Sequence, residues 1–248
     1  MGPRWKGKGA EAKALAEPMS EIVLALQTCL TTSDCKGLLF GSRVLFKADT
    51  EQSELLNRAC FGRASQKDKH WYELTLQEAF YLCYMLKCLK IEGGDGVVKT
   101  YEELWRLIIS EIEMFPEFFK AYTHLRMNNW VVKSGSQYGV DYVAYRHHPA
   151  LVHSEYAILV LSGRKDSGNS SGRLKLWSDL YGTIRLCGGV AKTLLVLHVL
   201  GNNNTNDTNS PVCLKNYDIE TRTISRWIPE QTREKKTYTK SCNDTKTQ

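Results

Sequence analysis

The sequence of 248 residues lacks several features that would place it in other classes of protein. Its eight cysteines include no C-x-x-C pair, so their spacing predicts neither a zinc site nor a disulfide framework, and we expect buried thiols. The longest apolar run, residues 193–200, is too short to span a membrane. No hydrophobic signal segment follows the basic N-terminal residues, so we expect an intracellular protein.

The positive charge of the chain is concentrated in its second half. Residues 1–112 carry 15 basic and 15 acidic side chains, residues 113–236 carry 16 and 11, and residues 237–248 carry 2 and 1. A basic surplus on one part of a chain is typical of a protein that binds a polyanion. An ordinary, slightly basic surface explains the same charge equally well.

Hydrophobic periodicity and loop composition predict an α/β (α+β) fold in two domains. We expect a flexible tail at residues 1–20, a smaller N-terminal α/β domain at 21–112, a C-terminal mixed-sheet domain at 113–236 and a flexible tail at 237–248. Two polar loops, residues 163–175 and 201–211, interrupt the C-terminal domain.

The N-terminal domain is expected to combine strands with two capped helices. Short β-branched and aromatic runs predict strands at residues 21–30 and 37–47. The sequence T-L-Q-E, in which Glu78 follows Thr75 by three residues, is a capping box that predicts a helix up to about residue 90. Thr100 and Glu103 form a second capping box, which predicts another helix.

The C-terminal domain is expected to begin with a helix at residues 116–127 and to continue as a sheet. Pro116 suits the first turn of that helix. Ser178 is expected to cap a later helix, from one side of which Arg185 and Lys192 would both project. Strands are predicted from alternating or continuous apolar runs, at residues 130–133, 138–145, 156–161, 193–200 and 216–229.

Three residues of complementary chemistry follow one another in this domain: Tyr145, His153 and Lys192. A phenol can remove a proton from a 2′-OH, an imidazole can donate one to a leaving oxygen, and an ammonium can stabilise charge at phosphorus. Together they predict a metal-free ribonuclease site. Taken singly, each has an ordinary explanation: the chain has 12 tyrosines, and His147 and His148 are alternatives to His153.

The sequence around these residues resembles the tRNA-splicing (tRNA-intron) endonuclease family. The resemblance covers residues 113–229 closely, residues 74–89 also resemble the helix that closes the family's N-terminal domain, and residues 1–70 resemble it only loosely. It implies that the C-terminal domain is a catalytic nuclease domain of restriction-endonuclease-like type. The motifs that carry it are K-S-G at 133–135, Y-G-V-D-Y-V-A-Y at 138–145, H-S-E-Y at 153–156, Arg185 with Lys192, and Arg226-Trp227.

The resemblance also implies a role for each matching residue. Tyr145 would be the general base toward the 2′-OH, His153 the general acid toward the departing 5′ oxygen, and Lys192 the group that stabilises the transition state. The products would be a 2′,3′-cyclic phosphate and a 5′-hydroxyl, with neither cofactor nor metal. An RNA-binding clamp that sandwiches a flipped base is implied for Arg185, Arg226 and Trp227.

Family membership further implies partners and a location. The chain would be one of two catalytic subunits in a heterotetramer that also holds two structural subunits, with pre-tRNA as substrate and the nucleus as its compartment. The wording R-L-C-G-G-V-A-K, at residues 185–192, and the long N-terminal domain resemble the subunit that cuts the 5′ splice site.

Two alternatives remain open from the residues. The first is a non-catalytic subunit that keeps the fold for assembly or RNA docking. The second is a metal-dependent nuclease, in which Asp141 would be followed by an E-x-K motif. Glu155 is followed by Tyr156 and Ala157, and the E-x-K that lies downstream begins at Glu234 in the tail, so this metal site is incomplete.

Overall fold

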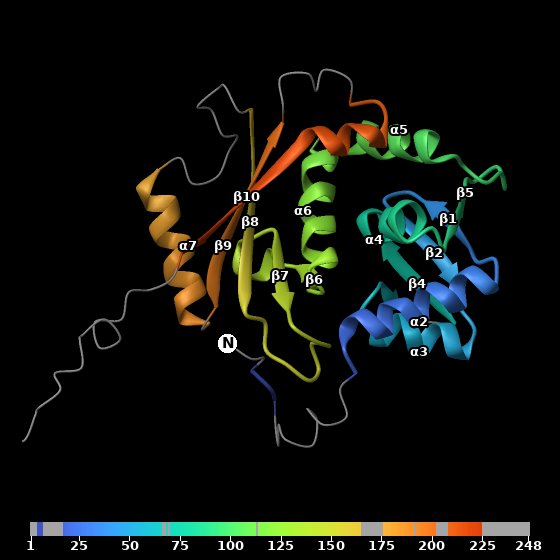
Figure 1. The fold of residues 1–248 in the computed structure, drawn as a ribbon, viewed down its shortest axis with the longest axis horizontal. Coiled ribbons are helices and arrows are strands. Elements are labelled where there is room, and N and C mark those ends of the chain that lie inside the picture. The colour runs from blue at the N-terminus through green and yellow to red at the C-terminus, as the bar shows by residue number, and fades with distance from the viewer. Residues whose placement is uncertain are drawn as a thin grey trace, which may run out of the picture.

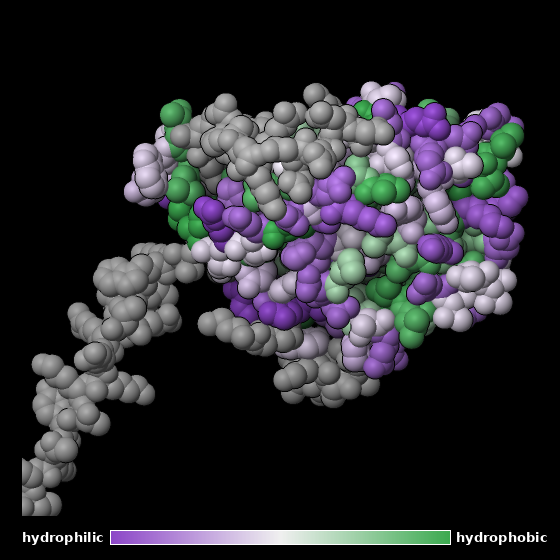
Figure 2. All heavy atoms as spheres, turned by 45° about the horizontal axis from the view of Figure 1, so that its top comes forward, coloured by the Kyte–Doolittle hydropathy of each residue, from purple (hydrophilic) through white to green (hydrophobic). Residues whose placement is uncertain are grey.

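The computed structural model describes residues 4–6, 17–65, 68, 70–112, 114–164, 176–190, 192–201 and 208–224. Within these ranges the chain forms two five-stranded sheets with helices packed against them (Figure 1). None of the described helices is long and apolar enough to cross a membrane. On the face toward the viewer in Figure 2, hydrophilic and hydrophobic residues are interspersed over the described part of the chain.

The N-terminal sheet is mixed, with the strand order β3-β4-β2-β1-β5. β1 pairs in parallel with β5, and the other neighbours pair antiparallel. The elements of this half are α2 (Met19–Thr32), β1 (Lys36–Phe40), β2 (Arg43–Lys47), α3 (Thr50–Arg58), β3 (Arg63–Ala64), β4 (Trp71–Thr75) and β5 (Lys90–Glu92).

The strand predicted for residues 21–30 is wrong, because these residues belong to the helix α2. The β-branched and aliphatic composition of the run favoured a strand. However, its buried side chains, Met19, Ile22, Leu26 and Leu30, recur every three or four residues. That spacing lets one helical face enter the core, and burial of this face outweighs the local strand preference.

The helix predicted from the first capping box is present but shorter than expected. The Thr75 hydroxyl accepts the Glu78 N–H at 3.2 Å, and the Glu78 carboxylate accepts the Thr75 N–H at 3.0 Å, so the box itself is confirmed. α4 (Leu76–Phe80) continues as a π-helical turn (Tyr81–Met85). Lys87 then adopts a left-handed backbone, which turns the chain toward β5 before residue 90.

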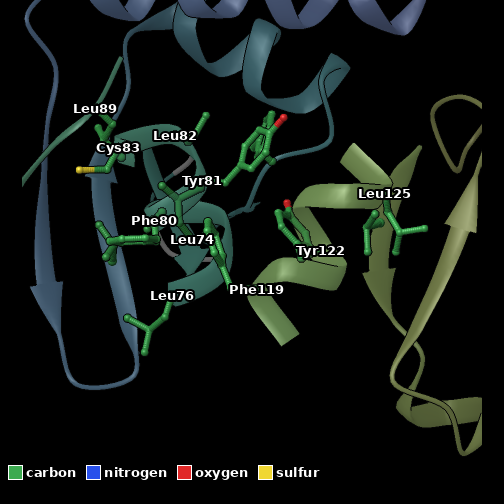
Figure 3. Packing of buried hydrophobic residues seen from close by; sticks show 14 of the residues in the cluster. Leu74, Leu76, Phe80, Tyr81, Leu82, Cys83, Leu89, Phe119, Tyr122 and Leu125 are labelled. Atoms are coloured by element: carbon green, nitrogen blue, oxygen red, sulfur yellow. The ribbon is translucent and has the colours of Figure 1, made fainter. Parts of the chain in front are cut away.

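Helices α5 (Tyr101–Glu111) and α6 (Phe115–Met127) follow, and α6 joins the two halves of the molecule. The second capping box is confirmed at the start of α5, and Pro116 lies in the first turn of α6 as predicted. The ring of Phe80, next to the π-helical turn, lies 5.0 Å from that of Phe119 in α6. One hydrophobic core therefore extends from the N-terminal sheet to α6 (Figure 3).

The C-terminal sheet has the order β10-β9-β8-β7-β6, and β8 and β9 are its parallel pair among the described strands. α7 (Trp177–Gly189) precedes β9 and packs on one face of the sheet, while α6 covers the other (Figure 1). The predicted α/β (α+β) fold class is confirmed, and the structure shows that both sheets are mixed. The strands are β6 (Val131–Ser134), β7 (Tyr142–Tyr145), β8 (Tyr156–Arg164), β9 (Thr193–Gly201) and β10 (Tyr217–Ile224).

Two details of this half differ from the prediction. β7 begins at Tyr142, because residues 135–141 form a turn in which the Gly135 N–H donates to the Asp141 carbonyl at 3.0 Å. Ser178 does not cap α7, since the helix begins at Trp177 and its N-cap position, Leu176, makes no side-chain hydrogen bond. The proposed boundaries of the domains stay predictions.

Candidate active site

The topology of the C-terminal sheet brings the three predicted catalytic residues to one end. Tyr145 is the last residue of β7, His153 lies just before β8, and Lys192 lies just before β9. β7 runs antiparallel to β8, and β8 runs parallel to β9. The end of β7 and the starts of β8 and β9 therefore lie together, at the lower end of the sheet in Figure 1.

Two hydrogen bonds extend the strand register to the site. The Glu155 N–H donates to the Ala144 carbonyl at 2.9 Å, and the Thr193 N–H donates to the Glu155 carbonyl at 3.0 Å. Extended by one residue, the register therefore places Tyr145 opposite Glu155, and Glu155 opposite Lys192. At a strand spacing of about 4.8 Å, the backbones of Tyr145 and Lys192 are about 10 Å apart, a gap that two long side chains can span.

Tyr145 is half-buried and packs against the core beneath α7. Burial raises the pKa of its phenol, a hydrogen bond with the Ser154 side chain lowers it, and the nearby Tyr138 raises it. The net direction is upward, away from the value that a general base needs at neutral pH. For Tyr145 to act as a general base, substrate binding or a nearby cation would have to lower this pKa.

His153 is exposed in the loop before β8. It is thus accessible to a substrate. The alternative histidines serve the local structure instead. His147 Nε2 lies 2.8 Å from the Glu17 carbonyl, and His148 Nδ1 accepts the Ala150 N–H at 3.1 Å. Burial lowers the pKa of His148, and the neighbouring His147 and Lys133 lower it further.

Lys192 follows α7 rather than lying on it, so the prediction that Arg185 and Lys192 share a helix face is wrong. α7 ends at Gly189, and the Lys192 N–H donates to the Cys187 carbonyl at 2.9 Å, which turns the chain into β9. The Lys192 ammonium nitrogen lies 4.3 Å from the centroid of the Tyr138 ring. This contact lets a cation remain half-buried at the sheet end.

The predicted RNA clamp is described only in part. Arg185 is exposed on α7, in the turn that leads toward Lys192. Arg226 and Trp227 lie outside the described residues, and the clamp therefore stays a prediction.

The acidic residue considered for a metal site lies elsewhere. The Asp141 carboxylate accepts the Val160 N–H at 2.8 Å, so it fixes the turn before β7 to the middle of β8. The Glu155 carboxylate accepts two hydrogen bonds from Arg146, both at 3.2 Å. Within the described ranges, no group of three or more His, Cys, Asp and Glu side chains could hold a metal ion.

Sequence reasoning missed three residues that contact the site. Ser154 and Tyr138 lie inside the quoted motifs, and their positions next to His153 and at the start of Y-G-V-D were the available signals. Arg4 lies in the segment predicted to be a flexible tail, yet its guanidinium donates to the Ser154 carbonyl at 2.9 Å. Residues 4–6 thus differ from the prediction for residues 1–20, because they pair with the loop that carries His153.

Comparison with known proteins identifies the family to which both halves of the chain are similar. Residues 115–208 match the family described as tRNA intron endonuclease, catalytic C-terminal domain, and residues 35–105 match the tRNA intron endonuclease N-terminal domain. The chain belongs to the tRNA intron endonuclease family, which confirms the resemblance drawn from the motifs.

The relatives within this family include subunits of one type. The chain is 52% identical to tRNA-splicing endonuclease subunit Sen2-2 of Arabidopsis thaliana, over 94% of this chain and 92% of the relative. It is 51% identical to subunit Sen2-1 of the same plant, over 96% of this chain and 100% of the relative. It is 28% identical to subunit Sen2 of Mus musculus, over 66% of this chain and 36% of the relative.

Proposed function

We propose that the chain is the subunit of a tRNA-splicing endonuclease that cleaves pre-tRNA at the 5′ splice site. Cleavage would proceed by metal-independent attack of the 2′-OH and would leave 2′,3′-cyclic phosphate and 5′-OH ends. The observation that carries the proposal is the meeting of the Tyr145, His153 and Lys192 segments at one end of the sheet. The similarity to Sen2 subunits supports the choice of the tRNA substrate and of this subunit type.

Each side chain has a task that its chemistry allows. Tyr145 takes the proton of the 2′-OH, whose oxygen attacks phosphorus. The P–O5′ bond breaks, and His153 donates a proton to the departing 5′ oxygen. Lys192 stabilises the negative charge that develops on the non-bridging oxygens. Because the nucleophile belongs to the RNA, no water is consumed in the cleavage step.

The raised pKa of Tyr145 limits how this base can act in the free subunit. A phenol normally titrates near roughly 10, so little phenolate exists at neutral pH even before burial acts. We propose that Tyr145 gains basicity from the Lys192 ammonium once the substrate is bound, or that it orients the 2′-OH. Both roles require the tyrosine hydroxyl.

Substrate positioning is assigned to three planar side chains. Arg185, Arg226 and Trp227 are proposed to stack on a base that leaves the helix at the splice site, because guanidinium and indole groups stack on unpaired bases of any identity. We further propose that the chain acts in the nucleus, in a heterotetramer with a second catalytic subunit and two structural subunits.

The test uses the complex reconstituted with its partner subunits and an intron-containing pre-tRNA. We expect cleavage at the 5′ splice site to persist in EDTA and to fall roughly 100- to 10,000-fold in His153→Ala. His70→Ala, at an exposed histidine of the N-terminal half, is the matched control and should cleave normally.

Three outcomes would contradict the proposal. Loss of cleavage on chelation, restored by Mg²⁺, would indicate a metal-dependent nuclease. Normal splicing after replacement of Tyr145, His153 and Lys192 together would indicate a non-catalytic subunit. Loss of 3′ cleavage alone in His153→Ala would assign the chain to the other splice site.

A further inference from the structure

Residues 4–6 form a short strap across the loop that joins β7 to β8. Trp5 makes an isolated antiparallel bridge with Val152, immediately before His153. In Figure 1 this segment lies at the lower end of the sheet, where β8 and β9 begin. We call residues 4–6 the N-terminal strap. It contacts the candidate active site from about 150 residues away in the sequence.

Backbone hydrogen bonds fix the strap on both sides of the bridge. The His153 N–H donates to the Arg4 carbonyl at 2.9 Å, and the Lys6 N–H donates to the Leu151 carbonyl at 2.7 Å. These are the alternating bonds of an antiparallel pair. The backbone of the proposed general acid is therefore held directly by the strap.

Side chains of the strap add further contacts to the same loop. The Arg4 guanidinium donates to the Ser154 carbonyl at 2.9 Å, and the Lys6 ammonium donates to the Pro149 carbonyl at 2.7 Å. The Trp5 ring lies 6.1 Å from the ring of His147. Contacts are thus spread along residues 147–154, which form most of the loop.

The loop itself makes few other hydrogen bonds near His153. The Leu151 and Val152 N–H groups both donate to the His148 carbonyl, which closes a local turn. Register with the sheet resumes at Glu155, whose N–H donates to Ala144. Between these two points, the His153 backbone N–H is bonded to the strap. Without the strap, this part of the loop would have greater conformational freedom.

We propose that the N-terminal strap positions His153 and Ser154 for cleavage. This inference rests on the proposed function, in which His153 is the general acid and Ser154 is hydrogen-bonded to Tyr145. The contacts of the strap given above fall on residues 147–154 of the loop. Its residues are positioning residues, which act through the backbone at residues 152–154.

A matched pair of substitutions at one position isolates the backbone contact. Lys6→Pro removes the N–H that donates to Leu151, because proline has no amide hydrogen. Lys6→Ala keeps that N–H and removes only the ammonium group. We expect Lys6→Pro to lower the single-turnover rate roughly tenfold to a hundredfold, and Lys6→Ala to lower it less than threefold. The Kd for pre-tRNA and the thermal midpoint should stay near those of the unmodified complex.

A substrate with a better leaving group tests which chemical step is affected. If the bridging 5′ oxygen at the splice site is replaced by sulfur, the departing thiolate no longer needs a proton from an acid. The rate deficits of Lys6→Pro and His153→Ala should then both shrink by at least fivefold. The deficit of Lys192→Ala should persist, because charge at the non-bridging oxygens still needs stabilisation.

The outcomes separate the strap from the proposed function. If Lys6→Pro cleaves at the normal rate while His153→Ala does not, the strap has no positioning role and the proposed function stands. If His153→Ala also cleaves normally, the proposed function itself fails. If Lys6→Pro weakens pre-tRNA binding in parallel with the rate, or if the sulfur substrate does not rescue it, the strap acts by another means and the positioning proposal is overturned.

Discussion

The ammonium nitrogen of Lys192 lies 4.3 Å from the centroid of the Tyr138 ring. Tyr138 belongs to the turn before β7, whereas Lys192 precedes β9, so the contact crosses the face of the sheet beneath α7. A cation above an aromatic ring is stabilised by about 0.5–2 kcal/mol, depending on its exposure. The ring therefore holds the lysine side chain at the sheet end before any substrate is bound.

Removing this ring should disturb the position of Lys192. We expect Tyr138→Leu to reduce the single-turnover cleavage rate by about tenfold, which corresponds to about 1.4 kcal/mol in the barrier. Tyr138→Phe keeps the ring face and should stay within about twofold of the original rate. Rates of Tyr138→Leu and Tyr138→Phe that are equally reduced would show that the hydroxyl, and not the ring, matters.

The Ser154 hydroxyl should influence the pH dependence of cleavage. Its hydrogen bond lowers the pKa of Tyr145 against the upward effect of burial. A general base acts in its deprotonated form, so Ser154→Ala should raise the pKa and move the ascending limb of the pH–rate profile to higher pH. The rate at neutral pH should fall, and part of it should return as the pH rises.

Ser162→Ala provides the control for this pH profile. Ser162 lies toward the far end of β8, where its hydroxyl donates to the Glu117 carboxylate at 3.3 Å. The ascending limb should stay in place in this variant. An unchanged profile in Ser154→Ala would instead indicate that Tyr145 orients the 2′-OH and does not accept its proton.

The aromatic core between the two halves should contribute strongly to stability. Phe80 is fully buried, and its ring contacts those of Trp105, Phe115 and Phe119 at 5.0–6.1 Å. We expect Phe80→Ala to lower the free energy of unfolding by about 3–5 kcal/mol. Phe40→Ala, at a phenylalanine that is 70% exposed, should change it by less than about 0.5 kcal/mol. Urea denaturation followed by circular dichroism measures both, and equal effects would contradict this account of the core.

That the segments of Tyr145, His153 and Lys192 meet could be predicted from the sequence, because they sit in short motifs at strand ends, while their catalytic roles stay predictions. Tyr145 ends β7 and His153 lies in the loop that leads to β8, and the register of a sheet brings such neighbours together. The position of Lys192 outside α7 could not be predicted, because the apolar pattern with a helical period continues past Gly189, where α7 ends. The contact of Arg4 with Ser154 joins segments far apart in the chain, and no local pattern reports such a pairing.

The same limit explains the error at α2. A run rich in Ile, Val and Leu fits a strand and a helix equally well over ten residues. The deciding factor is which face meets a partner, and in this fold Leu26 and Leu30 are fully buried while Leu24 is 61% exposed. Tertiary packing thus selected the helix. By contrast, Thr75 and Thr100 carry their signals locally, and both capping boxes formed as predicted.

The buried thiols should make the protein lose stability at alkaline pH. Burial raises the pKa of Cys60 and Cys83 to about 11 and that of Cys88 to about 12, from an ordinary value of 9.0. The unfolded chain then releases these protons at a lower pH than the folded protein does. Stability is therefore complete below pH 9 and falls as the pH rises toward 11–12.

Urea denaturation under reducing conditions at pH 8 and pH 10 would measure this loss. At pH 10 each such thiol should reduce the free energy of unfolding by about 1 kcal/mol relative to pH 8. Cys88→Ala should show a smaller difference between the two pH values, because one of the titrating groups is gone, although it starts from a lower stability. A difference that is the same with and without Cys88 would mean that this thiol is solvated, which contradicts its burial in the core between α4 and β5.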